Sequence, residues 1–290
     1  MRPLSIVIFS KDRAAQLDLC LQSIYKNLER LSERWQIHVI YTASSEEFSK
    51  AYYQLIWEHN TWNKPWLSFF PEHAYKGFKE ALEYCMAHWG DHVLFFTDDD
   101  IVYRKFEHQY ESIINDELFC TSFRLGTNTF VQDQYTNSNC LIPDEVIMGE
   151  QLIRKWNWKE QRKDTNFAYP FSVDGHMFPS DLAKKIINNT PKYHNPNSLE
   201  GKAQQHYIQD HIHSLPEEMG CFEKSLVINT PLNRVQETCH NGAGKFFGST
   251  PEELNKKFLD GERLTLEGMD FSTIIGVHQE LKLCWGEKCS

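Results

Sequence analysis

The feature that most constrains the fold is an alternation of short apolar runs with amphipathic helical stretches over the first hundred residues. Leu4 to Phe9 is rich in β-branched and aromatic residues, as is typical of a buried parallel strand. Behind it, Leu17, Leu21, Ile24 and Leu28 recur at helical spacing and lie on one face. A strand followed by a helix, repeated along a chain, predicts a mostly parallel α/β sheet flanked by helices.

The strand and helix pattern continues up to a run of carboxylates. Further strands are expected at Ile37 to Tyr41, Leu67 to Phe70 and His92 to Thr97, with helices over Glu46 to Ile56 and Phe78 to Trp89. Beyond about residue 120 the regularity fades. Three more helices are expected there, over Ser180 to Asn188, after Asn195-Pro196-Asn197, and over Pro251 to Leu259. Asp12 lies close to the position where the first helix needs an N-cap.

Three consecutive aspartates, Asp98, Asp99 and Asp100, follow the strand His92 to Thr97 directly. Open α/β sheets bind ligands at the carboxyl ends of their strands. Adjacent carboxylates raise each other's pKa unless a cation joins them. In an extended stretch Asp98 and Asp100 point the same way and Asp99 points opposite, which predicts Mg²⁺ or Mn²⁺ bound by Asp98 and Asp100. The alternative is a polar turn or the N-cap region of a helix.

The composition excludes some partners. The 40 acidic and 30 basic side chains give a formal charge of -10, which disfavours nucleic acid and anionic membrane surfaces. No apolar run approaches the roughly 18 residues of a membrane span. The cysteines are scattered without CxxC pairs, which favours reduced thiols and a cytoplasmic location.

Two of these motifs carry a resemblance to a known family. The segment Ser5 to Arg13, with the helix behind it, resembles the first strand and helix of GT-A glycosyltransferases, particularly family 2 and its relatives. His92 to Asp100 resembles the strand of those enzymes that carries the DxD motif. The resemblance covers residues 4–110 and, more loosely, residues 168–213.

The resemblance implies a GT-A fold, which is Rossmann-like, and a division of the chain into two functional halves. Residues 1–110 would form the half that binds the nucleotide sugar. Residues 111–290 would form the acceptor-binding half and the C-terminal segment of the same domain.

The resemblance also implies which residues bind the donor. Asp98 and Asp100 would handle the ribose and the metal. Family members often carry an acidic residue just after the second strand to read the base, whereas this chain has Tyr41-Thr42-Ala43-Ser44-Ser45, so a UDP-sugar and a GDP-sugar both stay open. Arg13 has an alternative interpretation as a solvated charge at a helix start. The implied nucleotide-sugar-binding residues are Phe9, Ser10, Arg13, Thr42, Asp98 and Asp99.

An inverting transfer needs a general base for the acceptor hydroxyl, and two carboxylates are candidates. Glu200 lies about one hundred residues past the aspartates, where family 2 enzymes carry an acidic pair, although here a glycine follows. Asp174, followed by Gly175 and His176, resembles the segment that bends around the acceptor. We predict Glu200 as the base, Asp174 as a second acidic group, and Gly175 and His176 as acceptor contacts. The alternatives are a first-turn acid at a helix start for Glu200 and a turn residue for Asp174.

Several residues later in the chain have two interpretations each. His278 resembles the late histidine that completes the metal site in GT-A enzymes, and an imidazole suits Mn²⁺ better than Mg²⁺. A lone histidine is as often structural. Arg234 and Gln236 would contact phosphate or acceptor, or lie in a surface loop. The i, i+4 spacing within His206, Asp210, His211 and His213 is compatible with a metal site, but without a matching third ligand we expect this cluster to be structural or to face the acceptor. The aromatic residues Trp156, Trp158 and Tyr169 would stack on sugar rings or belong to the core, and we prefer the core.

Together these features predict a metal-dependent, inverting glycosyltransferase that uses Mn²⁺ or Mg²⁺. Its donor would be a UDP-sugar or GDP-sugar, its acceptor a glycan or another hydroxyl compound, and its role polysaccharide biosynthesis. Two alternatives stay open: a catalytically silent GT-A-like protein that binds carbohydrate, and a nucleotidyltransferase.

Overall fold

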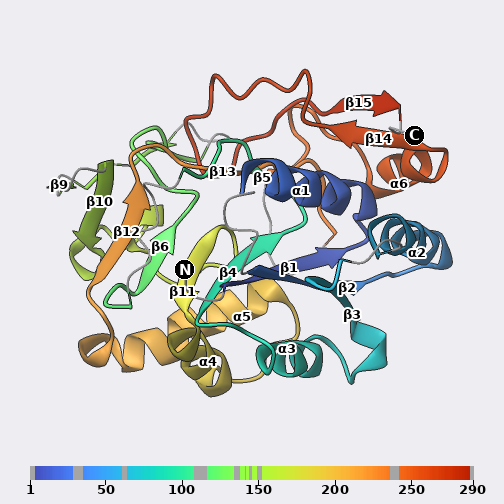
Figure 1. Ribbon diagram of the computed structural model, residues 1–290. Coiled ribbons are helices and arrows are strands. Elements are labelled where there is room, and N and C mark those ends of the chain that lie inside the picture. The colour runs from blue at the N-terminus through green and yellow to red at the C-terminus, as the bar shows by residue number, and fades with distance from the viewer. Residues whose placement is uncertain are drawn as a thin grey trace.

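The structure is a computed structural model with a central sheet between two helical layers (Figure 1). It describes residues 4–28, 35–60, 64–107, 116–133, 138–140, 142–143, 146–148, 152–235 and 242–287. No helix in these ranges combines the length and apolar character needed to cross a membrane.

Four parallel strands form one half of the sheet. They are β1 (Leu4–Lys11), β2 (Trp35–Thr42), β3 (Leu67–Pro71) and β4 (His92–Thr97), in the spatial order β3-β2-β1-β4. All four strands were expected from their apolar runs. The α/β class is therefore confirmed, with the carboxyl ends of these strands along one edge.

The other half of the sheet is mixed and continues the order as β11-β6-β12-β10-β9. Over the described residues the whole sheet thus has nine strands. The strand β11 runs antiparallel to both β4 and β6, and β12 runs parallel to β6. The bounds are β6 (Cys120–Ser122), β9 (Val146–Met148), β10 (Leu152–Asn157), β11 (His176–Pro179) and β12 (Glu218–Phe222).

Three strand pairs lie outside this sheet. The pair β5 (Asp100–Val102) and β13 (Val227–Asn229) matters most, because its register sets Asn229 opposite Asp100. The other pairs are β7 (Val131–Asp133) with β8 (Ser138–Asn139), and β14 (Glu262–Thr265) with β15 (Cys284–Glu287).

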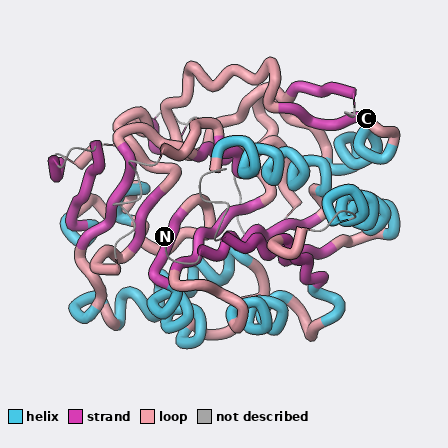
Figure 2. The backbone as a smooth tube through the Cα atoms, in the orientation of Figure 1, coloured by secondary structure: helices cyan, strands magenta, loops and turns pink. Residues whose placement is uncertain are grey.

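Helices cover both faces of the sheet (Figure 2). On one face lie α1 (Ala14–Asn27), α2 (Glu46–Asn60) and α6 (Pro251–Leu259), and on the other lie α3 (Phe78–Met86), α4 (Ser180–Asn189) and α5 (Pro196–Lys202). A hydrophobic core lies on each face of the sheet, and successive side chains of β1 point alternately into the two cores. Ile6 and Ile8 pack on the first face, while Val7 and Phe9 pack on the second. Short helical turns are η2 (Glu72–Ala74), η4 (Trp158–Glu160), η5 (Asn166–Ala168), η6 (Ala203–Ile208) and η7 (Ile212–Ser214).

Local capping differs from expectation at one helix. Asp12 does not cap α1, whose N-cap is Arg13 without a side-chain hydrogen bond. Asp12 has a φ of 57°, and its carboxylate accepts a 2.6 Å hydrogen bond from the Ser44 backbone N–H, so it joins two loops instead. The start of α5 does follow its sequence signal, because Asn195 and Ser198 form a capping box around Pro196.

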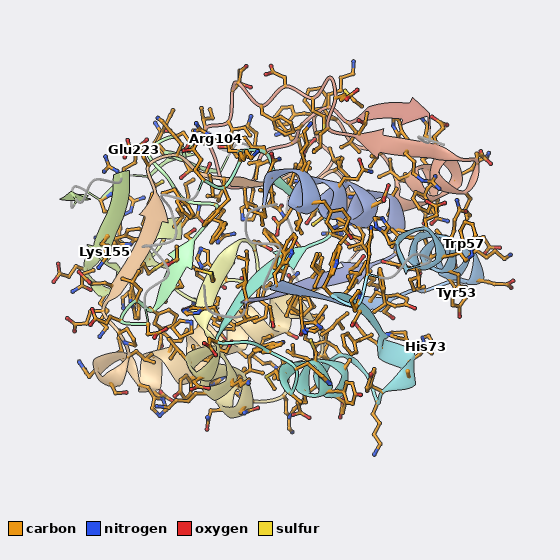
Figure 3. The ribbon with its side chains drawn as sticks, in the orientation of Figure 1. Tyr53, Trp57, His73, Arg104, Lys155 and Glu223 are labelled. Carbon is orange, nitrogen blue, oxygen red and sulfur yellow. The ribbon has the colours of Figure 1, made fainter. Side chains whose placement is uncertain are left out.

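The aromatic residues divide between core and surface. Trp156 and Trp158 are buried, which confirms the structural interpretation. Tyr53 and Trp57 on α2 point away from the sheet and are 61% and 65% exposed (Figure 3).

Candidate active site

A large cavity lies at the carboxyl ends of the parallel strands and has a volume of about 1190 Å³. It is large enough for a nucleotide-sized ligand together with a second molecule. Most of the predicted site residues line it: Phe9, Ser10, Arg13, Thr42, Asp98, Asp99, Asp174, Glu200 and His278. The cavity therefore brings together side chains from both halves of the chain.

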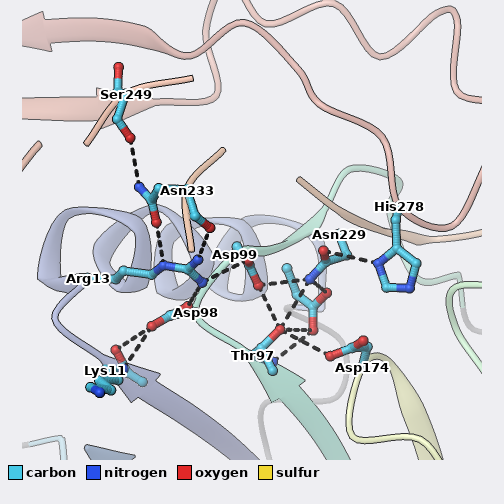
Figure 4. A network of polar contacts seen from close by, with 12 residues as sticks. Lys11, Arg13, Thr97, Asp98, Asp99, Asp174, Asn229, Asn233, Ser249 and His278 are labelled. Atoms are coloured by element: carbon cyan, nitrogen blue, oxygen red, sulfur yellow. Dashed lines mark hydrogen bonds and ion pairs between the residues drawn. The ribbon is translucent and has the colours of Figure 1, made fainter. Parts of the chain in front are cut away.

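Arg13 is the centre of a buried polar network on one wall (Figure 4). Its Nη1 donates to Asp98 Oδ1 at 3.0 Å and to Asp99 Oδ2 at 2.9 Å. Its Nε donates to Asn233 Oδ1 at 2.7 Å, and its Nη2 donates to the Asn233 carbonyl. Burial alone would lower the pKa of this guanidinium, but Asp99 and Asp98 raise it. The interpretation of Arg13 as a solvated charge is therefore wrong.

The second oxygen of Asp98 is bound by the loop after β1. Asp98 Oδ2 accepts from the Ser10 hydroxyl at 2.9 Å and from the Lys11 backbone N–H at 3.1 Å. The Tyr52 hydroxyl of α2 lies 2.6 Å from Ser10 Oγ and accepts from the Arg13 backbone N–H. Burial raises the pKa of Asp98 to about 6, while Arg13 lowers it and Asp99 raises it.

The three aspartates do not alternate as an extended strand would. Asp98 and Asp99 form a turn between β4 and β5, so the expectation that Asp98 and Asp100 point the same way is wrong. Asp99 lines the cavity, whereas Asp100 is 1% exposed and does not. Asp100 instead accepts from the Thr97 backbone N–H at 2.8 Å and from Asn229 Nδ2 at 3.0 Å. Burial, Asp174 and Asp99 raise the pKa of Asp100 well above its ordinary value.

Asn229 connects this wall to the opposite one. Its Nδ2 donates to Asp99 Oδ1 at 2.8 Å, so its Oδ1 is the acceptor that faces His278 Nδ1 at 3.1 Å. Nδ1 of His278 therefore carries the proton, and Nε2, with its lone pair, lies 3.4 Å from Arg124 Nη1.

Asp174 lies beside the same arginine. Arg124 Nη1 donates to Asp174 Oδ2 at 3.1 Å, and the Thr97 hydroxyl donates to Asp174 Oδ1 at 3.2 Å. Thr97 Oγ1 also lies 2.8 Å from Asp99 Oδ1. One threonine therefore contacts carboxylates on both walls.

Glu200 lies on α5, and its Oε1 accepts a 2.8 Å hydrogen bond from the Val173 backbone N–H. Burial and the neighbouring Asp174 raise the pKa of Glu200 to about 7, against the lowering effects of Ser172, Arg124 and the Val173 N–H. A carboxyl group that titrates near neutrality can accept or release a proton under physiological conditions.

The structure contradicts the predicted acceptor contacts of Gly175 and His176, because neither residue lines the cavity. His176 is wholly buried within β11, with Nδ1 3.3 Å from the Pro170 carbonyl, and burial lowers its pKa well below the ordinary value. Gly175 has a φ of 63°, and a Cβ there would lie 3.3 Å from the Arg124 Cβ. Its role is to let the chain turn beside Arg124.

The remaining candidates include two residues on the cavity and one residue outside the described part of the chain. Arg234 and Tyr169 line the cavity, and Gln236 lies outside the described residues. Across the part of the chain that the structure describes, no group of three or more His, Cys, Asp or Glu side chains could by itself hold a metal ion. This also excludes the described cluster His206, Asp210, His211 and His213 as a metal site.

The sequence missed four residues that organise the site: Arg124, Asn229, Asn233 and Glu72. Asn229 ends a β-like run, which was a usable signal for a strand end. Its contact with Asp99 depends on the pairing of β13 with β5, more than one hundred residues apart along the chain.

Comparisons with known proteins agree with the resemblance seen in the sequence. No family model matches the chain. The chain is similar to the bifunctional glycosyltransferase pgtA of Dictyostelium discoideum, with 26% identity over 259 residues that cover 81% of this chain and 33% of that protein. The likeness to a glycosyltransferase is thus confirmed, and the chain spans about a third of that relative's length.

Among solved structures, the chain is similar at low identity to TarS and to a mannosyltransferase. TarS of S. aureus (residues 1–349, with UDP) is 12% identical, with 89% of this chain and 70% of that chain covered and a TM-score of 0.49. The mannosyltransferase PcManGT of Pyrobaculum calidifontis, with GDP-Man and Mn²⁺, is 15% identical over 47% of this chain and 38% of that chain, with a TM-score of 0.33.

Proposed function

We propose that this protein is a glycosyltransferase that moves a sugar from a nucleoside-diphosphate sugar to the hydroxyl of a glycan or another acceptor, with inversion. The observation that carries the proposal is the cavity itself. It lies at the carboxyl ends of parallel strands, and on it Asp98 and Asp99 are accompanied by a carboxyl group, Glu200, with a pKa of about 7. The similarity to a known glycosyltransferase supports the same conclusion.

We assign the donor to the wall formed by residues 1–110. Phe9, Ser10 and Thr42 line this part of the cavity at the ends of β1 and β2. Arg13 holds Asp98 and Asp99 in place through two hydrogen bonds, so both carboxylates are oriented before a ligand arrives. Residues 111–290 supply the acceptor wall.

A divalent cation fits the chemistry of the side chains on the cavity. Carboxylate oxygens and an imidazole are ligands for Mn²⁺, and Mg²⁺ commonly uses one or two carboxylates together with substrate phosphates. Burial first, and neighbouring carboxylates second, raise the pKa values of Asp98 and Asp100, and a bound cation would favour the ionised carboxylates. Asp99 and His278 would hold the ion, and Asp100 is excluded because it does not reach the cavity. When bound, such a cation stabilises the negative charge of a departing diphosphate.

Glu200 is the proposed base. Its carboxylate accepts the proton of the acceptor hydroxyl while the acceptor oxygen forms a bond to the anomeric carbon. The bond from that carbon to the diphosphate breaks, and the nucleoside diphosphate leaves with its electron pair. Burial first, and the negative charge of Asp174 second, raise the pKa of Glu200 to about 7, while Arg124 holds Asp174 in place.

The test is nucleotide binding and donor turnover in wild type and in Asp99→Asn, each with Mn²⁺, Mg²⁺ or a chelator. We expect a nucleoside diphosphate to raise the melting temperature in a metal-dependent manner. We also expect slow release of sugar from the matching nucleotide sugar, and Asp99→Asn should abolish both effects. Asp164→Asn, at an exposed carboxylate, is the matched control.

The same assay separates the alternatives. A nucleotidyltransferase would release pyrophosphate from a nucleoside triphosphate and a sugar phosphate. A catalytically silent protein would bind a glycan and no nucleotide in any metal, and either result would overturn the proposal. Once a donor and an acceptor are known, the anomeric configuration of the product tests inversion. The cytoplasmic location and the role in polysaccharide biosynthesis stay predictions.

A further inference from the structure

We propose that Glu72 reads the base of the donor nucleotide and that this base is guanine, so that the donor is a GDP-sugar. The inference rests on the proposed function. It concerns a carboxylate at the end of β3, a position to which the sequence assigned no role.

The position of Glu72 suits a contact with the base. It follows Pro71, the last residue of β3, and lines the cavity together with Lys11, Thr42 and Ser44. The order β3-β2-β1-β4 places it three strands away from Asp98 and Asp99. At a spacing of about 4.8 Å between strands, this separation is about 14 Å. An extended nucleoside diphosphate spans a comparable distance from its base to its second phosphate.

The turn η2 presents Glu72 to the cavity rather than to solvent. Its neighbour His73 points outward at the β3 edge of the sheet and is exposed (Figure 3). Glu72 is partly buried, and burial raises its pKa to about 7 while Lys11 lowers it. The cavity wall at this edge therefore contains a carboxyl group that has lost part of its hydration.

The half-buried Glu72 carboxylate has the charge of Lys11 nearby but accepts no hydrogen bond from the described part of the protein. The nearby Asp12 carboxylate, by contrast, accepts from the Ser44 N–H. Because Glu72 lines the cavity, its oxygens can accept hydrogen bonds from water or from a ligand that displaces the water. The side chain is thus available to accept from a bound molecule.

The hydrogen-bonding pattern of the bases selects guanine. An ionised carboxylate offers two acceptor oxygens and no donor. Guanine presents two adjacent donors, N1–H and the 2-amino group, which match both oxygens. Uracil presents one N–H between two carbonyl oxygens that a carboxylate repels, and adenine and cytosine place a ring acceptor beside their amino group. The hydroxyls of Thr42 and Ser44 line the same region and can donate to the guanine carbonyl.

The test is a panel of nucleoside diphosphates, measured by calorimetry at pH 8 with Mn²⁺. We expect wild type to bind GDP at least about tenfold more tightly than UDP, ADP or CDP, and to bind inosine diphosphate about tenfold more weakly than GDP because it lacks the amino group. In Glu72→Gln, GDP affinity should fall about 10- to 100-fold. Xanthosine diphosphate should gain affinity in this variant, because the amide N–H can donate to the carbonyl that replaces the amino group.

Matched controls keep the outcome clear. Glu80→Gln, at an exposed carboxylate of α3, should bind every nucleotide as wild type does. The gain for xanthosine diphosphate shows that Glu72→Gln is folded, and a thermal melt checks this independently. Tighter binding of UDP than of GDP to the wild type would overturn the inference, and so would an unchanged GDP affinity in Glu72→Gln. Either result would leave the proposed function standing. If no nucleotide binds at all, both are overturned.

Discussion

The two walls of the cavity hold their carboxylates in different ways. On the wall at the ends of β1 and β4, Asp98 and Asp99 form ion pairs with the buried Arg13. On the opposite wall, Glu200 accepts from the Val173 backbone N–H, and its pKa is raised to about 7. The first arrangement keeps charges fixed for binding, and the second keeps a proton exchangeable. One cavity therefore contains carboxyl groups suited to two roles, and the environment of each decides which.

The largest effect on the transfer rate is expected from Glu200→Gln. If Glu200 is the base, the transfer rate should fall by about 10² to 10⁴, because the amide cannot accept the acceptor proton. Nucleotide affinity should stay within about twofold, since Glu200 lies on the other wall. Steady-state transfer assays together with calorimetry measure the two quantities. Glu217→Gln, at an exposed carboxylate, is the control. Near-normal turnover in Glu200→Gln would show that Glu200 is not the base and that the two walls do not differ in this role.

Arg13→Ala should have the largest effect on stability. It leaves Asp98 and Asp99 buried without their cation, which lowers the free energy of unfolding by about 3–5 kcal/mol at pH 8. Burial raises the pKa of Asp98 and Arg13 holds it down to about 6, so in the variant this pKa lies above 6. Protonation of Asp98 in the variant should therefore make the loss smaller as the pH falls from 8 toward 6, and the loss should level off below 6. Urea unfolding at pH 8 and pH 5 measures both values.

The control for Arg13 is Arg162→Ala, whose guanidinium is exposed. An equal loss of stability in Arg13→Ala at both pH values would show that the ion pair is not its cause.

The pH profile of the wild type should follow Glu200. The base acts only when ionised, so kcat/KM for the acceptor should rise about tenfold per pH unit below pH 7 and level off above it. Initial rates between pH 5 and 9 with saturating donor and low acceptor give this profile without a contribution from donor binding by Glu72. A plateau that extends below pH 6 would contradict the assignment of Glu200.

Asp174→Asn should shift the rising part of this pH profile, its acid limb, to lower pH. The negative charge of Asp174 raises the pKa of Glu200, and its removal also leaves Arg124 free to lower that pKa. The same pH series, run on this variant, measures the shift. Movement of the limb to higher pH would mean that Asp174 acts on Glu200 in some way other than through its charge.

Tyr52→Phe should have the smallest effect on both stability and the pH profile. The Tyr52 hydroxyl contacts Ser10 Oγ and the Arg13 backbone N–H, so its loss should destabilise the protein by about 1 kcal/mol. The acid limb should not move, because Tyr52 belongs to the donor wall. Thermal unfolding and the pH profile test both expectations, with Tyr53→Phe on the exposed face of α2 as the control.

Much of the donor wall could be predicted from the sequence. The four parallel strands follow local runs of apolar residues, and parallel strands bring their carboxyl ends to one edge. Phe9, Ser10, Thr42 and Asp98 therefore meet for reasons that short windows of sequence contain. The periodicity of strands and helices is a local property, which is why it predicts this half well.

Tertiary structure alone decided the rest of the site. The turn at Asp98 and Asp99 sends Asp100 into the interior, and β13 then supplies Asn229 to link Asp99 with His278. The burial that raises the pKa of Glu200 to about 7 likewise depends on tertiary packing, since Leu199 beside it belongs to the same core cluster as Phe171 and Val173. Side-chain direction at a turn, strand pairing across a hundred residues and desolvation all depend on contacts between distant segments. A residue's neighbours along the chain do not specify these contacts, so the sequence identified the candidate groups and the fold determined their partners and protonation.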